Sequence, residues 1–170
     1  GLRLAQSVKR PLRSASMHLL RDPAGLFLVY LAIAQPLQSQ GLGQRLLQYV
    51  WQIGNQRCAE VGAPAKGMIW EVDPPALATS DQERLKRERR IAFFSRQGGV
   101  ILPCAYVQPP LHGDKPVNML LMHRPAEGTS PPDAEQTMRL VRAMYLQKYG
   151  GVNGIETAVL QELLAAQELT

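Results

Sequence analysis

The residues best suited to chemistry form one short segment, Gln38-Ser39-Gln40-Gly41-Leu42-Gly43, between an apolar run and an amphipathic helical pattern. The apolar run, residues 26–34, predicts a buried strand, and the pattern after the glycines predicts a helix that ends before Gly62. A helix that begins directly after a glycine turn leaves its first backbone N–H groups without intrahelical partners, at the positive end of the helix dipole. This arrangement favours binding of a phosphate group.

Two common phosphate-binding motifs do not fit this turn. A dinucleotide-binding loop would need a third glycine at position 46, where the chain has Leu46. A Walker loop would need Gly-Lys-Ser/Thr in place of Gly43-Gln44-Arg45. The pattern that remains is Gln/Arg-x-x-Gly-x-Gly/Ala between a strand and a helix.

The elements that must position this turn follow from periodicity and from turn residues. Residues 26–34 and 68–72 are expected to pair as parallel strands through a right-handed helical crossover. Further strands are predicted over 15–20, 100–107 and 117–123, and helices over 80–97 and from 132 onwards. The last helical region carries two apolar faces, so it should pack against the rest of the protein.

Composition restricts the class of protein. The chain has 170 residues, 45% of them hydrophobic, which predicts one globular domain. Its longest apolar run, 26–34, is shorter than the roughly 18 residues of a membrane span, so we expect a soluble protein without a membrane partner. Cys58 and Cys104 stand far apart without a set of histidine ligands, so neither a metal site nor a disulfide framework is indicated, and a cytoplasmic location fits best.

The net charge of +5 suits a phosphate-bearing ligand. The basic residues do not form one face interleaved with aromatic residues, so no nucleic acid partner is predicted. An RNA-associated basic protein remains a weaker alternative that would need a contiguous cationic surface.

The glycine turn and its flanks resemble the GNAT acetyltransferase superfamily. The pyrophosphate loop of that family is similar to residues 38–43, and the strand before it is similar to Leu31-Ala32-Ile33-Ala34-Gln35-Pro36. Family members continue with a strand like 67–72 and then a helix like Arg90-Ile91-Ala92-Phe93-Phe94, which closes at Gly98. The resemblance covers roughly residues 16–124.

This resemblance implies an α+β fold. The GNAT-like sheet is expected to be mixed and mostly antiparallel, with a V-shaped splay and helices on both faces. Residues 1–131 would form an acyl-CoA-binding domain with a short or incomplete N-terminal part, and residues 132–170 a C-terminal helical extension packed on the same domain. The side of the sheet that the short N-terminal part leaves open would be covered by this extension or by another subunit, so a homodimer is a possible arrangement.

The resemblance also implies the cosubstrate, acetyl-CoA, and the residues that bind it. A main-chain N–H group near Ile33 or Ala34 would polarise the thioester carbonyl. Strand residues would run beside the pantetheine arm, and the amide N–H groups of residues 39–44 would bind the pyrophosphate. The implied cofactor-binding residues are Leu31, Ala32, Ile33, Gln38, Ser39, Gln40, Gly41, Leu42, Gly43, Gln44 and Phe94.

The candidate catalytic residues are Glu71 and Tyr106. Glu71, on the strand after the cofactor helix, is the candidate general base, because burial there would raise its pKa, with Asp73 as the second candidate. Tyr106 could act as an acid or contact the acceptor, or it could be a core tyrosine. Phe94 stands where many GNAT members have a tyrosine that protonates the departing thiolate, so solvent would have to supply that proton. Arg87 could contact a cofactor phosphate or form part of an exposed basic face.

Two functions of different classes follow from these residues. The leading one is an N-acetyltransferase that moves an acetyl group from acetyl-CoA to a primary amine by direct attack in a ternary complex. The acceptor would be a small-molecule or peptide amine, and the sequence does not identify it. The alternative is a non-catalytic CoA-binding sensor or scaffold, which the missing hydroxyl at Phe94 would suit.

Overall fold

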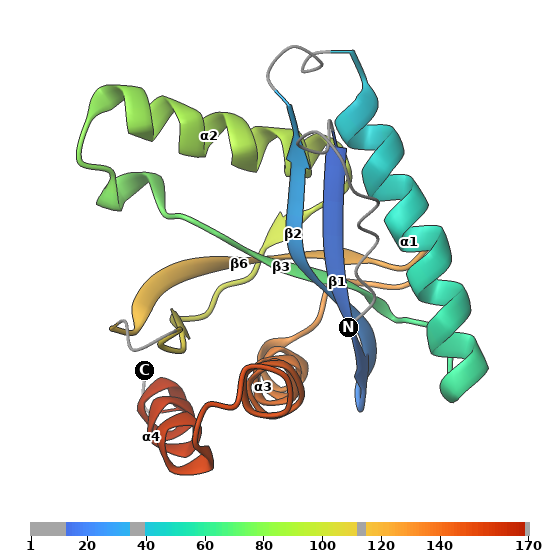
Figure 1. Cartoon of the computed structure of the whole chain (residues 1–170), viewed down its shortest axis with the longest axis vertical. Coiled ribbons are helices and arrows are strands. Elements are labelled where there is room, and N and C mark those ends of the chain that lie inside the picture. Colours follow the sequence, from blue (N-terminus) through green and yellow to red (C-terminus); the bar gives the residue numbers. More distant parts are fainter. Residues whose placement is uncertain (1–12, 35–39, 112–114, 169–170) are drawn as a thin grey trace, which may run out of the picture.

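The computed structural model describes residues 13–34, 40–111 and 115–168. Figure 1 shows the arrangement of the helices and strands. In chain order the elements are β1 (Arg13–Arg21), β2 (Ala24–Ile33), α1 (Leu42–Val61), β3 (Gly67–Val72), the 3₁₀ turn η2 (Pro75–Leu77), α2 (Asp81–Arg96), β4 (Val100–Ile101), β5 (Tyr106–Gln108), β6 (Val117–Pro125), α3 (Ala134–Ala143), the π-helical segment η3 (Met144–Gly150) and α4 (Thr157–Glu168).

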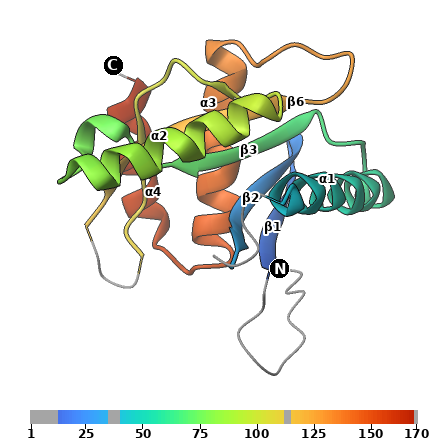
Figure 2. The same cartoon turned by 90° about the horizontal axis from the view of Figure 1, so that it is seen from above.

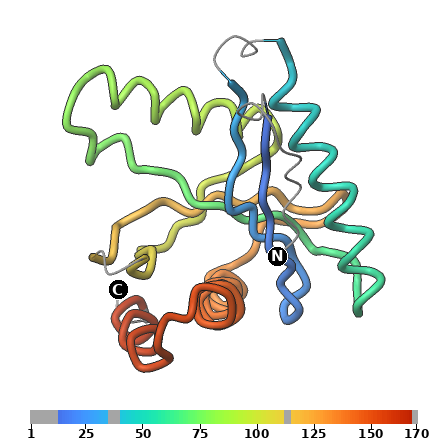
Figure 3. The backbone as a smooth tube through the Cα atoms, viewed as in Figure 1, coloured from blue at the N-terminus to red at the C-terminus, as the bar shows by residue number. Residues whose placement is uncertain are grey.

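The strands form one mixed sheet in the order β1-β2-β3-β6-β4, and β5 also pairs with β6. Only the pairing of β2 with β3 is parallel, and α1 makes the crossover between these two strands, as Figure 3 shows along the chain. The predicted α+β fold with a mostly antiparallel sheet is confirmed, and so is the parallel pairing through a helical crossover.

The sheet splays open between β2 and β3. The two strands pair at only two positions, Leu26 with Met68 and Phe27 with Ile69. Beyond these pairs β2 continues to Ile33 and diverges from β3, so that the two strands cross steeply in Figure 1. A β-bulge lies at the start of this divergence, because β1 pairs with Leu28 and Tyr30 on β2 and leaves Val29 without an opposing residue. The predicted V-shaped splay is present.

The helices cover both faces of the sheet. Figures 1 and 2 show α2 on one side of β3 and β6, with α3 and α4 on the other. Side chains alternate along β3, as a strand buried on both faces requires. Met68, Trp70 and Val72 pack with α1 and α2, whereas Ile69 packs with α3, η3 and α4. Glu71 therefore points to the same face as Ile69.

Two expectations about the second half of the chain are corrected. The strand predicted over 100–107 is two short strands, β4 and β5, because Pro103 has no N–H group to donate to a strand ladder. The helical region after 132 is also not regular throughout, since it passes from α3 into the π-helical segment η3, and Ile155 precedes α4 instead of lying on it.

None of the helices in the described residues is both long enough and apolar enough to cross a membrane. The division into a domain over 1–131 and a helical extension over 132–170 stays a prediction. The first of two core clusters nevertheless joins both parts, because it combines Leu20, Phe27 and Ile69 of the sheet with Val141 of α3 and Leu160 of α4.

Candidate active site

The N-terminus of α1 has no side-chain cap. Gly41 precedes the helix with φ of 73°, a left-handed conformation that glycine adopts without strain. The first intrahelical bond is donated by Arg45 N to Gly41 O at 3.2 Å. The N–H groups of Leu42, Gly43 and Gln44 donate to no acceptor in the part of the chain that the structure describes. The first turn also contains no acidic residue, so this helix end keeps both its free donors and its positive potential.

A cleft of about 750 Å³ lies between this helix end and α2, and we call it the α1–α2 cleft. Gly41, Gly43 and Gln44 line it on one side, and Leu31 and Ile33 of β2 extend into it. Cationic side chains of α2 line the opposite wall. They are Lys86, Arg87, Arg89, Arg90 and Arg96. The cleft thus combines unpaired backbone donors with a cationic wall, which is the chemistry that binds phosphates.

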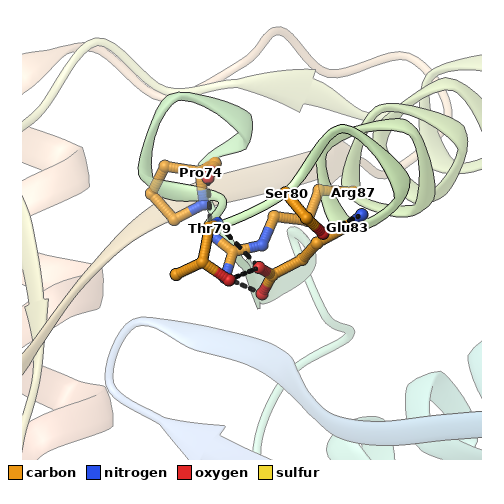
Figure 4. Close-up of polar contacts among 5 residues, drawn as sticks. All are labelled: Pro74, Thr79, Ser80, Glu83 and Arg87. Carbon is orange, nitrogen blue, oxygen red and sulfur yellow. Dashed lines mark hydrogen bonds and ion pairs between the residues drawn. The ribbon is translucent and has the colours of Figure 1, made fainter.

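The N-terminus of α2 carries a side-chain cap, which α1 lacks in the described residues (Figure 4). Ser80 Oγ accepts from Glu83 N at 3.2 Å, and the Glu83 carboxylate accepts from Thr79 N at 2.8 Å. The hydrogen bonds from Thr79 and the ion pair with Arg87 lower the pKa of Glu83 to about 2. The cap therefore stays ionised and fixes the start of the helix that carries the cationic wall.

Arg87 is held in place by this same network. Its guanidinium donates to Pro74 O at 2.7 Å and to Glu83 Oε1 at 2.6 Å, and its side chain is only 17% exposed. Arg87 is therefore not part of an exposed basic face, and its contacts tie α2 to the loop after β3. Among the cations of the wall, Arg90 lies over the Phe94 ring, 5.6 Å from its centroid.

Phe94 lies at the inner end of the cleft. The ring is 1% exposed and packs against Trp70 and Phe93, with centroids 4.7 and 5.1 Å away. A buried aromatic cluster therefore occupies the position where the family resemblance implied a cofactor contact, and it has no hydroxyl group to act as an acid.

On the other face of the sheet, Glu71 lies at the centre of a hydrogen-bonded group that we call the Glu71 cluster. Its carboxylate accepts from Tyr106 Oη at 2.5 Å, from Tyr149 Oη at 2.7 Å and from Gln108 Nε2 at 2.8 Å. The donors come from β5 and η3, so three separate parts of the fold meet at this carboxylate. The structure thus brings together the two residues that the sequence predicted as catalytic, Glu71 and Tyr106.

Burial dominates the electrostatics of this cluster. It raises the pKa of Glu71 above the ordinary value of 4.5, although the three donors and the nearby Lys148 favour the charged form. Burial and the Glu71 charge together also raise the pKa values of Tyr106 and Tyr149, so both phenols keep their protons at neutral pH. Glu71 is then a proton acceptor with two permanently protonated neighbours, which suits a general base.

The cleft and the Glu71 cluster lie at the same end of β3. Asp73, directly after the strand, lines the cleft, and Glu71 stands two residues earlier on the opposite face. Ile33, the last residue of β2, lines the cleft from the neighbouring strand. All these groups therefore gather where the parallel pair ends and diverges, which is where open sheets with parallel strands commonly bind ligands.

The other predicted cofactor residues divide into three groups. Leu31, Ile33, Gly41, Gly43, Gln44 and Phe94 line the cleft. Ala32, Gln40 and Leu42 are adjacent in the chain but do not line it. Gln38 and Ser39 lie outside the described residues, so the predicted pyrophosphate loop is described only from Gln40 onwards.

Sequence reasoning missed Tyr149 and Gln108. Tyr149 stands 78 residues after Glu71 in the chain, and no local motif connects them. One signal was present: a carboxylate on a strand buried on both faces needs hydrogen-bond donors from elsewhere in the chain. Tyr145 and Tyr149 share the spacing of one helix face and were the obvious donors in the C-terminal region.

The order of elements and the position of the splay match those that the sequence resemblance implied. The fold is GNAT-like. A scan of protein-family models finds no match to the chain, and a search of curated proteins finds no similar sequence. In the described residues, no three His, Cys, Asp or Glu side chains gather in a group that could hold a metal ion.

Several solved structures are similar to this chain at low sequence identity. Ard1 from Thermoplasma volcanium is 17% identical with a TM-score of 0.41, and the alignment covers 67% of this chain and 61% of that one. Arabidopsis thaliana Naa50, solved with the bisubstrate analogue CoA-Ac-MVNAL, is 15% identical with a TM-score of 0.42, covering 67% and 64%. A mutant AtaT toxin bound to acetyl-CoA and the C-terminus of its antitoxin AtaR is 17% identical with a TM-score of 0.36, covering 66% and 56%. The chain spans less than two thirds of each of these structures.

Proposed function

We propose that this protein is an N-acetyltransferase that moves an acetyl group from acetyl-CoA to a primary amine of a small molecule or peptide. The observation that carries the proposal is the N-terminus of α1, where the N–H groups of Gly43 and Gln44 have no acceptor in the described residues and line a cleft with a cationic wall. A diphosphate satisfies those donors and neutralises that wall. A cleft of about 750 Å³ is also within the size range of small-molecule sites.

Residues on both faces of the sheet, at the splay, would take part in the reaction. Acetyl-CoA supplies an acyl thioester, whose carbonyl carbon is the electrophile. The backbone of β2 at Leu31 and Ala32 lies beyond the last position that pairs with β3, so it can run beside the pantetheine arm and hydrogen-bond its amides. The N–H groups of Leu42, Gly43 and Gln44 bind the pyrophosphate.

Glu71 takes the proton of the amine as it attacks. The new C–N bond forms while the C–S bond breaks, and the amine proton ends on the Glu71 carboxylate. Tyr106, Tyr149 and Gln108 hold that carboxylate in one orientation. The thiolate that leaves has a pKa near 8.5 and takes its proton from solvent, because Phe94 has no hydroxyl group.

The first test replaces Gly41 with valine. At a φ of 73° a β-branched residue is strained by about 1–2 kcal/mol, and its side chain lies where the phosphates approach. We expect Gly41→Val to weaken CoA binding at least tenfold by isothermal titration calorimetry. The matched control is Gly154→Val, since Gly154 has a φ of 72° and equally open surroundings but lies between η3 and α4. Equal CoA affinity in wild type and Gly41→Val would show that the pyrophosphate does not bind at this turn.

A second candidate function is a CoA-binding module without turnover, and the hydroxyl-free Phe94 ring is the observation that favours it. The two functions differ in one assay. Release of free CoA from acetyl-CoA, measured with a thiol reagent across a panel of polyamines, amino acids and peptides, identifies an enzyme. Tight CoA binding with no release above the rate without amine, for every acceptor, identifies the module.

A further inference from the structure

A second cavity lies away from the α1–α2 cleft, and we call it the His123 cavity. Its volume is about 510 Å³, which suits a small molecule. Its walls are the turn between β1 and β2, the start of β3, residues 129–132 and α3. Gly25 and Gly67, at the beginnings of β2 and β3, line it, whereas the cleft lies at the far ends of the same strands.

His123 lines this cavity. His123 is 5% exposed, and its Nδ1 atom is buried without a hydrogen bond in the described part of the chain. Its other nitrogen lies over Gly67, where a Cβ atom would come within 2.3 Å of Nε2, so only glycine at position 67 leaves room for the ring. Burial lowers the pKa of His123 to about 4, so the ring is neutral at neutral pH, with one donor and one acceptor.

The rim of the cavity is cationic. Arg21 of β1, Lys66 before β3 and Arg139 of α3 come from three separate elements and line the same space. Asp22 is the only carboxylate among the described lining residues, and it lies 3.7 Å from Arg139 in a pair whose side chains are 87% and 61% exposed. Such an exposed pair is weak, so the rim keeps an excess of positive charge.

The inner wall of the cavity is apolar. Leu140 lines it beside Ile69, and both belong to the buried core that includes α3. Pro23 and Pro132 add further apolar surface. The cavity therefore offers cations at its mouth, an apolar wall inside and one neutral hydrogen-bonding ring.

From this combination we propose that the His123 cavity is a second ligand site, which binds a small organic carboxylate with an apolar body of a few carbons. The carboxylate lies at the rim beside Lys66 and Arg139, and the apolar body packs along Leu140 and Pro132 towards His123. An organic amine of the same size does not bind there, because it would place a cation among cations. This inference does not depend on acetyl-CoA binding in the α1–α2 cleft.

The test uses hexanoate as the probe and hexylamine as its control of equal length and opposite charge. Binding is followed by NMR through the imidazole Cε1–H signal of His123, assigned by its loss in His123→Gln. We expect saturable shifts of this signal with millimolar hexanoate and none with hexylamine. No shift with hexanoate, or equal shifts with both compounds, would overturn the proposal.

Surface substitutions locate the carboxylate without disturbing the core. Lys66→Gln and Arg139→Gln should each weaken hexanoate binding about tenfold, the effect of losing one charge-assisted hydrogen bond. Lys115→Gln, an exposed change outside the cavity, should leave it unchanged. Unchanged affinity in both rim variants would contradict the proposal. CoA affinity measured on the same variants should match wild type, so this outcome is separate from any failure of the acetyltransferase proposal.

Discussion

The α1–α2 cleft and the Glu71 cluster lie on opposite faces of the sheet, and they differ in whether their polar groups have hydrogen-bond partners among the described residues. In the α1–α2 cleft, backbone donors of Gly43 and Gln44 have no partner among the described residues, and the cations of α2 face them across an open space. In the Glu71 cluster, each carboxylate oxygen of one residue already accepts from neighbouring side chains. In the described residues, the cleft therefore offers donors without acceptors, whereas the Glu71 carboxylate is satisfied within the protein.

This difference predicts that substitutions in the cleft and in the cluster affect different measured quantities. Unsatisfied donors and cations gain most from a polyanionic ligand, so changes in the cleft should alter affinity. A carboxylate fixed by three donors holds its geometry before any substrate arrives, so changes in the cluster should alter turnover and its pH dependence.

The largest effect is expected for Glu71→Gln. Removing the general base should lower the turnover number by about 10²–10⁴-fold, because the amide cannot accept the amine proton. CoA affinity should stay within about twofold of wild type, since no atom of the cleft changes. Steady-state kinetics with saturating acetyl-CoA measure the first quantity and calorimetry the second. Turnover equal to wild type would remove Glu71 from the mechanism.

The pH profile gives a related prediction for Tyr149→Phe. The Tyr149 hydroxyl stabilises the charged carboxylate, so its removal should raise the pKa of Glu71 further. Because the base works only when ionised, activity falls as pH drops through that pKa, and this acidic limb should move to higher pH in the variant. Turnover at neutral pH should fall about tenfold with the KM for acetyl-CoA unchanged.

Tyr49→Phe is the matched control for this change, because Tyr49 is 51% exposed on α1 and has no part in the cluster. A variant Tyr149→Phe with an acidic limb identical to that of wild type would show that Tyr149 does not position the base.

A smaller effect is expected from the cationic wall. Lys86→Gln and Arg90→Gln should each weaken CoA binding a few-fold, because exposed cations in water contribute little individually. The loss should shrink as salt is raised, since screening already removes most of the attraction in wild type. Titrations at low and high ionic strength measure this, and turnover at saturating acetyl-CoA should not change. Equal losses at both ionic strengths would argue against a charge contact.

The smallest functional effect is expected at the capped helix. Ser80→Ala removes the side chain that accepts from Glu83 N and should lower the free energy of unfolding by about 1 kcal/mol. CoA affinity should stay the same, because the Ser80 cap serves the fold and not the ligand. Urea denaturation measures the change in the free energy of unfolding, and calorimetry measures CoA affinity. A tenfold loss of CoA affinity would show that the Ser80 cap also contributes to ligand binding.

The α1 side of the cleft could be predicted from sequence because its parts are local, whereas the cationic wall of α2 was not predicted beyond Arg87. The strand, the glycine turn and the start of α1 are consecutive, and Phe94 is recognised from the helix pattern around it. The Glu71 cluster could be predicted only in part. Glu71 and Tyr106 were candidates on their own strands, but Tyr149 reaches Glu71 only because η3 packs on the far face of the sheet. Such long-range contacts depend on how helices pack, which no local pattern specifies.

The structure also shows where local reasoning failed within the fold. The apolar sequence from Val100 to Val107 predicted a single strand, but Pro103 divides it, and β5 then pairs with β6 at a different register from β4. This break places Tyr106 and Gln108 at the end of β6 near Glu71.

The most direct test of the account follows the backbone amides of α1 during a CoA titration by ¹H–¹⁵N NMR. The account predicts that the amide signals of Leu42, Gly43 and Gln44 shift downfield and become protected from hydrogen exchange as CoA saturates, because their free N–H groups acquire phosphate acceptors. If these three signals keep their positions and exchange rates at saturation, the uncapped helix end does not bind the pyrophosphate, and the proposed function loses its basis.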